Sequence, residues 1–260
     1  SARYRDPDAS TIGSAAASVP ACSPSCEAPP PMTDECVTGT LADVTEPSAP
    51  SPTDAPSGLP SLLGPGATVV TMELERGVVG DLATLTQLRD CAQDRGTLDA
   101  CGRLVSAARS QDVAVVHCIA EWRADRRGTA LNAPLTRALA RNPAQILAGS
   151  DAVELIDELG DTSNDLTSVR RHGLTPFTGT DLDAVLRSLG TTTVIVCGVS
   201  LNVGVLGLCL TAADLGYRVV VASDAVVGVP ADYGDAVIAN TLAMVATITG
   251  RYVGFPTAWA

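Results

Sequence analysis

Acidic and basic side chains follow apolar runs of the chain at positions where a small molecule could bind. Glu73 ends one such run, and the adjacent arginines Arg170 and Arg171 come before the segment 172–177. His117 lies near the end of another run. A carboxyl group can transfer a proton, and a guanidinium can hold a carboxylate through two hydrogen bonds. Such residues form a site when the strands before them end at the same edge of a parallel sheet.

The stretch 198–204, Gly-Val-Ser-Leu-Asn-Val-Gly, passes from an apolar run into a helical pattern within a few residues. Backbone N–H groups at a helix start carry partial positive charge, so they could hold a developing oxyanion or a substrate carboxylate. An ordinary strand-to-helix turn explains the same pattern, and on this feature alone it is the simpler interpretation. The turn lacks GxGxxG, and the chain has no GxxxxGKS/T, so a nucleotide-binding site would lack its phosphate cradle.

The elements that would position these residues alternate between two patterns. Short apolar runs rich in β-branched residues predict buried strands at 69–74, 113–119, 193–197 and 218–222. Helical patterns are found at 98–109, 181–188, 203–215 and 231–248. Strand–helix alternation at this spacing predicts βαβ units. The predicted fold class is therefore α/β: a three-layer α/β/α arrangement with a mostly parallel, Rossmann-like central sheet.

The chain of 260 residues carries 17 arginines, no lysine and 29 acidic residues, which gives a net charge of −12. Nucleic acids and anionic membranes bind basic surfaces, so neither is an expected partner. Residues 188–213 have no charge over a length that could span a membrane. Glycines and polar residues interrupt them, so a strand, a turn and a buried helix are the better interpretation. The lack of lysine excludes any mechanism that uses a lysine amine.

Residues 1–60 differ from the rest of the chain. They are rich in Pro, Ser and Ala and contain eight acidic residues against two arginines. Such a segment buries too little apolar surface to offset its ordering entropy, so we predict a disordered acidic segment at 1–60 and an α/β domain at 61–260. The segment lacks a basic start followed by an apolar run, which argues against a secretory signal. Met32 is a candidate natural start, which would make 1–31 an upstream extension.

The eight cysteines do not have the spacing of a disulfide scaffold or a zinc site. Only Cys22 and Cys26 are closely spaced, and no second pair balances them. The simpler interpretation is buried, reduced thiols in a cytoplasmic protein. Because the whole chain has two histidines, His117 and His172, we expect no metal and no cofactor.

Four ordered stretches of the sequence resemble the isochorismatase-like hydrolases, a superfamily that includes nicotinamidases and N-carbamoylsarcosine amidases. The stretches are 69–77, 177–183, 198–204 and 212–225, and the resemblance covers about residues 65–255. It implies the isochorismatase-like α/β fold, a small-molecule substrate and a homo-oligomer.

The usual amidases of this superfamily use an Asp after the first strand, a Lys after the third strand and a Cys at the start of the helix after the fourth. By resemblance, Glu73 stands at the Asp position and Gly204 at the Cys position. Arg171 stands at the Lys position, with Arg170 as the alternative register. A glycine has no side chain to attack a substrate, so an acyl-enzyme is not available at position 204.

Loss of the thiol does not end all chemistry of the superfamily. Cys209 would point away from position 204 on a helix and Cys197 toward the core, so neither replaces it. The superfamily's isochorismatases also have Gly at this position, and they cleave a vinyl ether with an acid at the Asp position. Glu73 would be that acid if burial raised its pKa, a shift that a nearby arginine opposes. Arg171 would clamp a substrate carboxylate.

The resemblance also implies which residues line the pocket. Ser200 and Gly204 would offer backbone N–H groups, with a cis peptide between Val199 and Ser200. The candidate substrate-binding residues are Ser200, Asn202, Phe177, Trp122 and His117. Core packing explains Phe177 equally well, and Asn202 is more simply a cap of the following helix.

Two functions from different classes remain open. The first is a hydrolase of a small organic substrate that works without a cysteine nucleophile, with enol-ether cleavage by Glu73 as its most specific form. The second is a catalytically silent relative that binds a metabolite or a protein partner. The changes at positions 73, 171 and 204 favour the second function. The retained pair of an acid and a cation favours the first, which we prefer.

Overall fold

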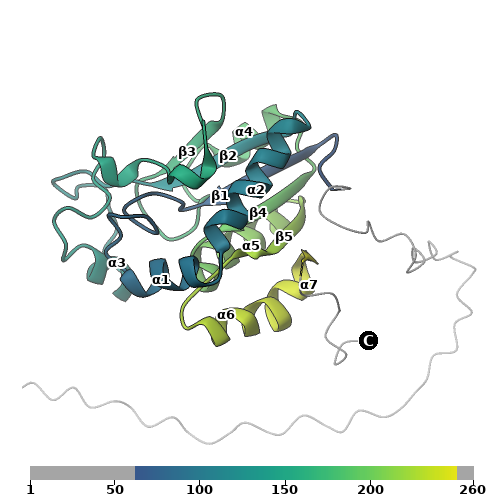
Figure 1. The fold of residues 1–260 in the computed structure, drawn as a ribbon. Helices are drawn as coiled ribbons and strands as arrows, with labels where there is room; N and C mark the ends of the chain where they lie inside the picture. Colours follow the sequence, from purple (N-terminus) through teal and green to yellow (C-terminus); the bar gives the residue numbers. More distant parts are fainter. Residues whose placement is uncertain (1–61, 251–260) are drawn as a thin grey trace, which may run out of the picture. The chain divides into compact units, whose positions relative to one another are not determined.

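Residues 62–250 are described by a computed structural model, and the predicted disordered segment 1–60 lies outside them. Within this part of the chain one sheet has the strand order β3-β2-β1-β4-β5-β6, and every neighbouring pair is parallel (Figure 1). The strands are β1 (Ala67–Met72), β2 (Ala114–Ala120), β3 (Leu166–Arg170), β4 (Thr193–Gly198), β5 (Arg218–Val226) and β6 (Thr247–Thr249). The central strand β4 is buried along its whole length, as expected for a strand covered on both faces.

Helices connect the strands. They are α1 (Thr86–Asp94), α2 (Thr97–Ser110), α3 (Pro134–Leu139), α4 (Leu182–Ser188), α5 (Leu206–Asp214), α6 (Ala231–Val237) and α7 (Ala243–Val245). The π-helical turns η5 (Leu201–Val205) and η6 (Ile238–Leu242) precede α5 and α7, and η3 (Asp151–Val153) and η4 (Asp157–Leu159) are 3-10 turns. No helix in residues 62–250 is long and apolar enough to cross a bilayer.

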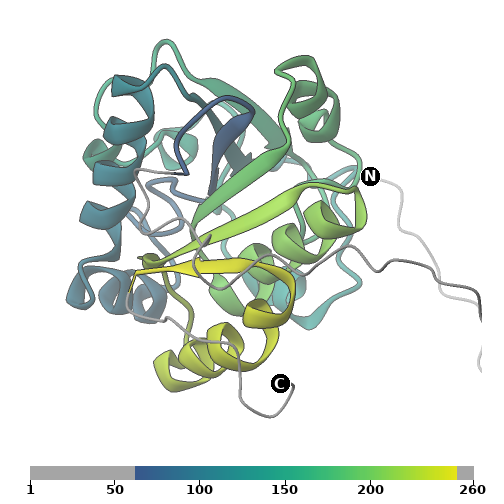
Figure 2. The same ribbon diagram turned by 90° about the vertical axis from the view of Figure 1, so that its right-hand side faces the viewer.

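Two hydrophobic clusters separate the layers. One cluster packs α2 against one face of the sheet and includes Leu104 and Ile195. The other packs α4 and α5 against the opposite face and includes Leu186 and Leu208. Figure 2 shows the sheet between these two helical layers. The predicted three-layer α/β/α class is therefore confirmed, and the sheet is wholly parallel.

The sequence patterns predict the buried strands better than the edge strands. The four predicted strands are present as β1, β2, β4 and β5. The edge strand β3 reads Leu-Thr-Ser-Val-Arg and exposes its first two residues, so it gives no apolar run. The predicted helix 231–248 is wrong at its end, because helical structure stops at Val245 and the three-residue edge strand β6 follows.

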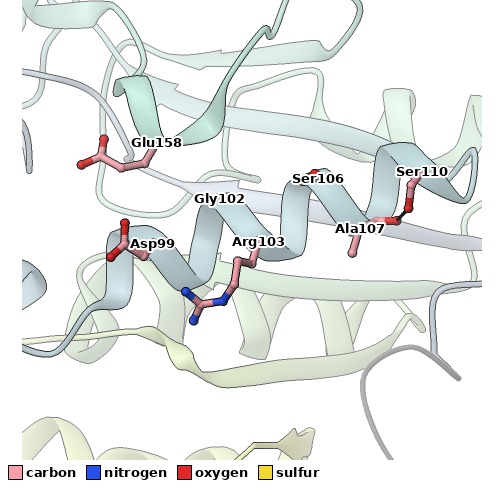
Figure 3. A pocket seen from close by; sticks show the side chains of 7 residues that line it. All are labelled: Asp99, Gly102, Arg103, Ser106, Ala107, Ser110 and Glu158. Carbon is pink, nitrogen blue, oxygen red and sulfur yellow. Dashed lines mark hydrogen bonds between the residues drawn. The ribbon is translucent and has the colours of Figure 1, made fainter.

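Helix α2 packs closely against η4 at Gly102. A Cβ on Gly102 would lie 2.2 Å from the carbonyl oxygen of Glu158, so a larger residue does not fit there. Figure 3 shows Glu158 beside the helix, with Asp99 and Arg103 along the same outer face. This face borders a wide hollow of about 570 Å³. None of the predicted site residues lines this hollow.

Candidate active site

Five of the predicted site residues meet at one cavity of about 190 Å³. They are Glu73, Trp122, Ser200, Asn202 and Gly204. Glu73 follows β1, Trp122 follows β2, and the other three follow β4. These strands are neighbours in the sheet, so their carboxyl ends bring the residues to the same edge.

Glu73 and Arg170 form an ion pair in the wall of this cavity. Arg170 ends β3 and Glu73 follows β1, so the ion pair spans the intervening strand β2. The Nη2 group of Arg170 donates to Oε1 of Glu73, and its Nη1 group donates to the carbonyl oxygen of Gly173. The side chains are 8% and 18% exposed for Arg170 and Glu73. Burial lowers the pKa of Arg170 to about 10, which leaves it protonated at neutral pH.

The arginine that reaches the cavity is Arg170, the alternative register, and not Arg171. Arg171 is 61% exposed, and its Nη2 lies 2.6 Å from Oε1 of Glu121 outside the cavity lining. Successive side chains along a strand point to opposite faces, which separates the two arginines. Because both residues are arginines, the sequence alone does not show which of them enters the cavity.

Polar contacts fix the turn after β4. The peptide between Val199 and Ser200 is cis, as expected. The Ser200 hydroxyl donates to Oδ1 of Asn202, and Nδ2 of Asn202 donates to the carbonyl oxygen of Val229 at 3.2 Å. The Asn202 side chain therefore ties this turn to the loop after β5. The helix here has no side-chain cap, so the capping interpretation of Asn202 is wrong.

Gly204 faces Met72, the last residue of β1. A Cβ at position 204 would lie 2.6 Å from Cε of Met72, so the fully buried Met72 side chain fills the space beside the glycine. No cysteine among the described residues lines the cavity. Burial raises the pKa of Cys209 to about 12. A hydrogen bond with Cys101, together with burial, raises the pKa of Cys197, so neither thiol is a ready nucleophile.

We expect Gly204→Cys to destabilise the fold by about 1–3 kcal/mol, because the new side chain must displace the enclosed end of Met72. Gly64 provides the matched control, since nothing lies within 4 Å of a Cβ built there. Gly64→Cys should therefore change the free energy of unfolding little. Urea unfolding under reducing conditions measures both variants, and equal stability of the two would contradict the Met72 contact.

Two predicted substrate-binding residues lie in the core instead of the cavity. His117 is fully buried in β2, with Nδ1 2.9 Å from Thr71 Oγ1 and Nε2 2.9 Å from an Asp165 carboxylate oxygen. Burial lowers the pKa of His117, so it is neutral at pH 7. Phe177 stacks on Tyr217 with ring centroids 6.5 Å apart. Each residue has a tertiary partner that the sequence pattern does not reveal, and neither lines the cavity.

Glu75 is a buried acid that no motif in the sequence marks. Its Oε1 accepts a hydrogen bond from the Ala120 backbone N–H at 2.6 Å. Its Oε2 has no hydrogen-bond partner within residues 62–250. Burial raises the pKa of Glu75 to about 8, so the carboxyl is neutral at pH 7. A glutamate that follows a strand is ordinarily solvated, so the sequence carries no signal for this burial.

The cavity wall also includes loop residues that no motif marks. Thr84 precedes α1 and Gln145 follows α3, and both line the cavity. The Thr84 hydroxyl donates to Oε1 of Gln145, which is 3% exposed. The amide nitrogen of Gln145 has no hydrogen-bond acceptor in the described part of the chain, so it remains as a donor.

The cavity has few charged groups. Glu73 and Arg170 are the charged side chains that line it among the described residues. Across residues 62–250, no group of three His, Cys, Asp or Glu side chains could hold a metal ion. The cavity thus combines one carboxyl and one guanidinium with amide and hydroxyl groups. This set suits proton transfer to a small molecule.

The fold and this site define an isochorismatase-like α/β domain. A family model described as the isochorismatase domain matches residues 69–251, and the chain belongs to the isochorismatase family of hydrolases. The uncharacterized isochorismatase family protein YecD of Escherichia coli O157:H7 is 33% identical over 124 residues. The match covers 48% of this chain and spans 63% of the length of YecD.

Solved structures show the same fold. An isochorismatase family protein from Desulfovibrio vulgaris subsp. vulgaris str. Hildenborough has a TM-score of 0.63 at 22% identity, over 72% of this chain and 94% of that one. A pyrazinamidase/nicotinamidase from Streptococcus mutans UA159 has a TM-score of 0.58 at 22% identity, over 70% of this chain and 99% of that one. At these identities the likeness is one of fold.

Proposed function

We propose that this chain is a hydrolase of a small organic substrate that works without a cysteine nucleophile, and that it cleaves an enol ether with Glu73 as the acid. Membership of a hydrolase family supports the reaction class. The observation that carries the proposal is the ion pair of Glu73 and Arg170 in one cavity beside Gly204. This ion pair supplies a proton-transfer group at a site where position 204 supplies no nucleophile.

In the proposed reaction, the protonated carboxyl of Glu73 gives its proton to the terminal carbon of the enol ether. The C=C electron pair forms the new C–H bond and leaves an oxocarbenium ion, which water attacks. The proton lost by this water returns to Glu73, and the hemiketal splits into a carbonyl compound and an alcohol. Arg170 lies where it stabilises the Glu73 carboxylate that the first step produces.

A catalytically silent relative that binds a metabolite is the second candidate. The ion pair itself favours it in one respect, because a guanidinium beside a carboxyl favours the ionised form. An ionised Glu73 must take up a proton before it can act as an acid. Turnover therefore distinguishes the two candidates.

The test is an assay of the full chain against a panel of enol ethers, amides and esters, before and after alkylation with iodoacetamide. We expect turnover of an enol ether that survives alkylation. Glu73→Gln should lower this turnover by about 100- to 10,000-fold, the range for loss of a general acid. Glu121→Gln is the matched control, because Glu121 also pairs with an arginine but lies outside the cavity lining.

Three outcomes would count against the proposed hydrolase. No turnover across the panel, or equal turnover by the wild type and Glu73→Gln, would favour the silent candidate. Loss of turnover on alkylation would contradict the cysteine-free mechanism.

A further inference from the structure

The charges in the cavity cancel. Glu73 and Arg170 pair with each other, and Arg170 also donates to the Gly173 carbonyl. A substrate carboxylate would have to compete with Glu73 for the guanidinium. It would also bring an uncompensated charge into a largely desolvated site, which is costly. The net charge of −12 on the whole chain opposes the approach of anions as well.

Other arginines of the neighbouring loops are engaged outside the cavity. Arg126 lies over the Trp122 ring, 4.8 Å from its centroid, and its guanidinium donates to three backbone carbonyl oxygens. Arg171 pairs with Glu121. Neither arginine lines the cavity, so within the described residues the lining holds no cation free to receive an anion.

Several neutral polar groups of the wall are satisfied by one another. The Ser200 hydroxyl donates to Asn202, and the Thr84 hydroxyl donates to Gln145. The amide nitrogen of Gln145 remains as a donor. An amide N–H in an apolar wall favours a neutral acceptor such as a carbonyl or ether oxygen, because that acceptor loses little hydration when it is buried.

Apolar side chains form much of the remaining wall. They include Val78, Leu85, Leu88, Leu135, Leu139 and Ile146. The cavity volume is about 190 Å³. An apolar cavity of about 150 Å³ holds benzene, so this one has room for a slightly larger ring compound.

We propose that the cavity selects an uncharged, mainly apolar molecule about the size of a monosubstituted benzene, and that it excludes carboxylates. Gln145 donates one hydrogen bond to an oxygen of this molecule. The inference rests on the proposed function only in taking this cavity as the functional site. It replaces the expectation that an arginine clamps a substrate carboxylate.

Acetophenone and benzoate are suitable probes, because they have the same number of heavy atoms and differ in charge. We expect acetophenone to raise the Tm of the full chain in a concentration-dependent way. Isothermal titration should show benzoate binding at least tenfold more weakly. Benzoate binding as tight as that of acetophenone would overturn the proposal. A protein that binds neither probe would also overturn it.

A charge switch tests the role of the ion pair. Glu73→Gln removes the negative charge that compensates Arg170 and so gives the cavity a net positive charge. The affinity for benzoate should therefore rise at least tenfold while that for acetophenone changes little. In the double variant Glu73→Gln/Arg170→Gln the cavity again has no net charge, so the gain in benzoate affinity should be lost. An unchanged affinity for benzoate in Glu73→Gln would overturn the charge argument.

The hydrogen bond from Gln145 has its own control ligand. Gln145→Leu should weaken acetophenone binding about fivefold or more. Binding of ethylbenzene, which has a similar shape and no oxygen, should stay the same. An unchanged affinity for acetophenone, or equal losses for both ligands, would remove the hydrogen bond from the proposal.

The proposed ligand selectivity and the proposed hydrolase activity can be tested separately. Turnover of a carboxylate-bearing enol ether would overturn the inference of a neutral substrate and leave the hydrolase intact. Acetophenone binding by the wild type, together with the charge switch in benzoate affinity but without turnover of any substrate, would overturn the hydrolase and leave the selectivity intact.

Discussion

Arg170→Gln is expected to lower enol-ether turnover by about 100-fold or more, whereas Arg171→Gln should leave it within about twofold. Removal of one preorganised charge-stabilising group from an active site typically lowers kcat by about 100- to 1,000-fold. Arg170 faces Glu73 in the cavity, and Arg171 pairs with Glu121 outside the lining. The two variants therefore place the same substitution in two different environments.

Steady-state kinetics of the two variants give kcat and KM separately, and urea unfolding shows whether each is folded. Arg170→Lys is a useful third variant, because it keeps the charge but loses the planar guanidinium that joins Glu73 to the Gly173 carbonyl. It should recover part of the turnover. A folded Arg170→Gln protein with wild-type turnover would contradict the assignment of this arginine.

Glu75→Gln should stabilise the protein as pH rises, by up to about 4 kcal/mol at pH 8. Burial raises the pKa of Glu75 from 4.5 to about 8, so between these values the folded protein holds a proton that the unfolded chain has released. Wild-type stability therefore falls as pH rises through this window. Glutamine does not titrate, and its side-chain oxygen can still accept the Ala120 N–H.

Urea unfolding of wild type and Glu75→Gln at pH 5, 6.5 and 8 tests this expectation. Comparison of the two proteins at each pH cancels the contributions of other titrating groups to the unfolding free energy. One of these groups is His117, whose lowered pKa makes stability rise with pH. The advantage of Glu75→Gln should grow steadily across the series. A difference in unfolding free energy that is the same at pH 5 and pH 8 would contradict a buried, neutral Glu75.

The fold was predictable where burial imposes a strong pattern. The strand β4 is buried at every position, and its Thr-Val-Ile-Val-Cys-Gly sequence is rich in β-branched residues. The strand β3 has water on part of its surface and one neighbouring strand, so its sequence needs no apolar run. The class of fold can be predicted from the buried strands. The edge strands form by pairing with a neighbouring strand, and the local sequence does not indicate this pairing.

The site was predictable where residues directly follow strands. Glu73 lines the cavity together with Ser200, Asn202, Val203 and Gly204 of the turn after β4, because parallel strands end together at one edge. His117 has a suitable residue type and strand position, but its bonds to Thr71 and Asp165 hold it in the core. Long-range partners of this kind are set by the packing of distant segments, which spacing alone does not reveal.

The ion pair in the cavity joins residues that are 97 positions apart, and Arg170 belongs to a five-residue strand at the margin of the sheet. Local opening of a protein requires the least free energy where buried contacts are fewest. If β3 separates from β2, Arg170 leaves Glu73 while the inner strands keep their hydrogen bonds. The assembled site therefore lasts only as long as β3 stays paired with β2.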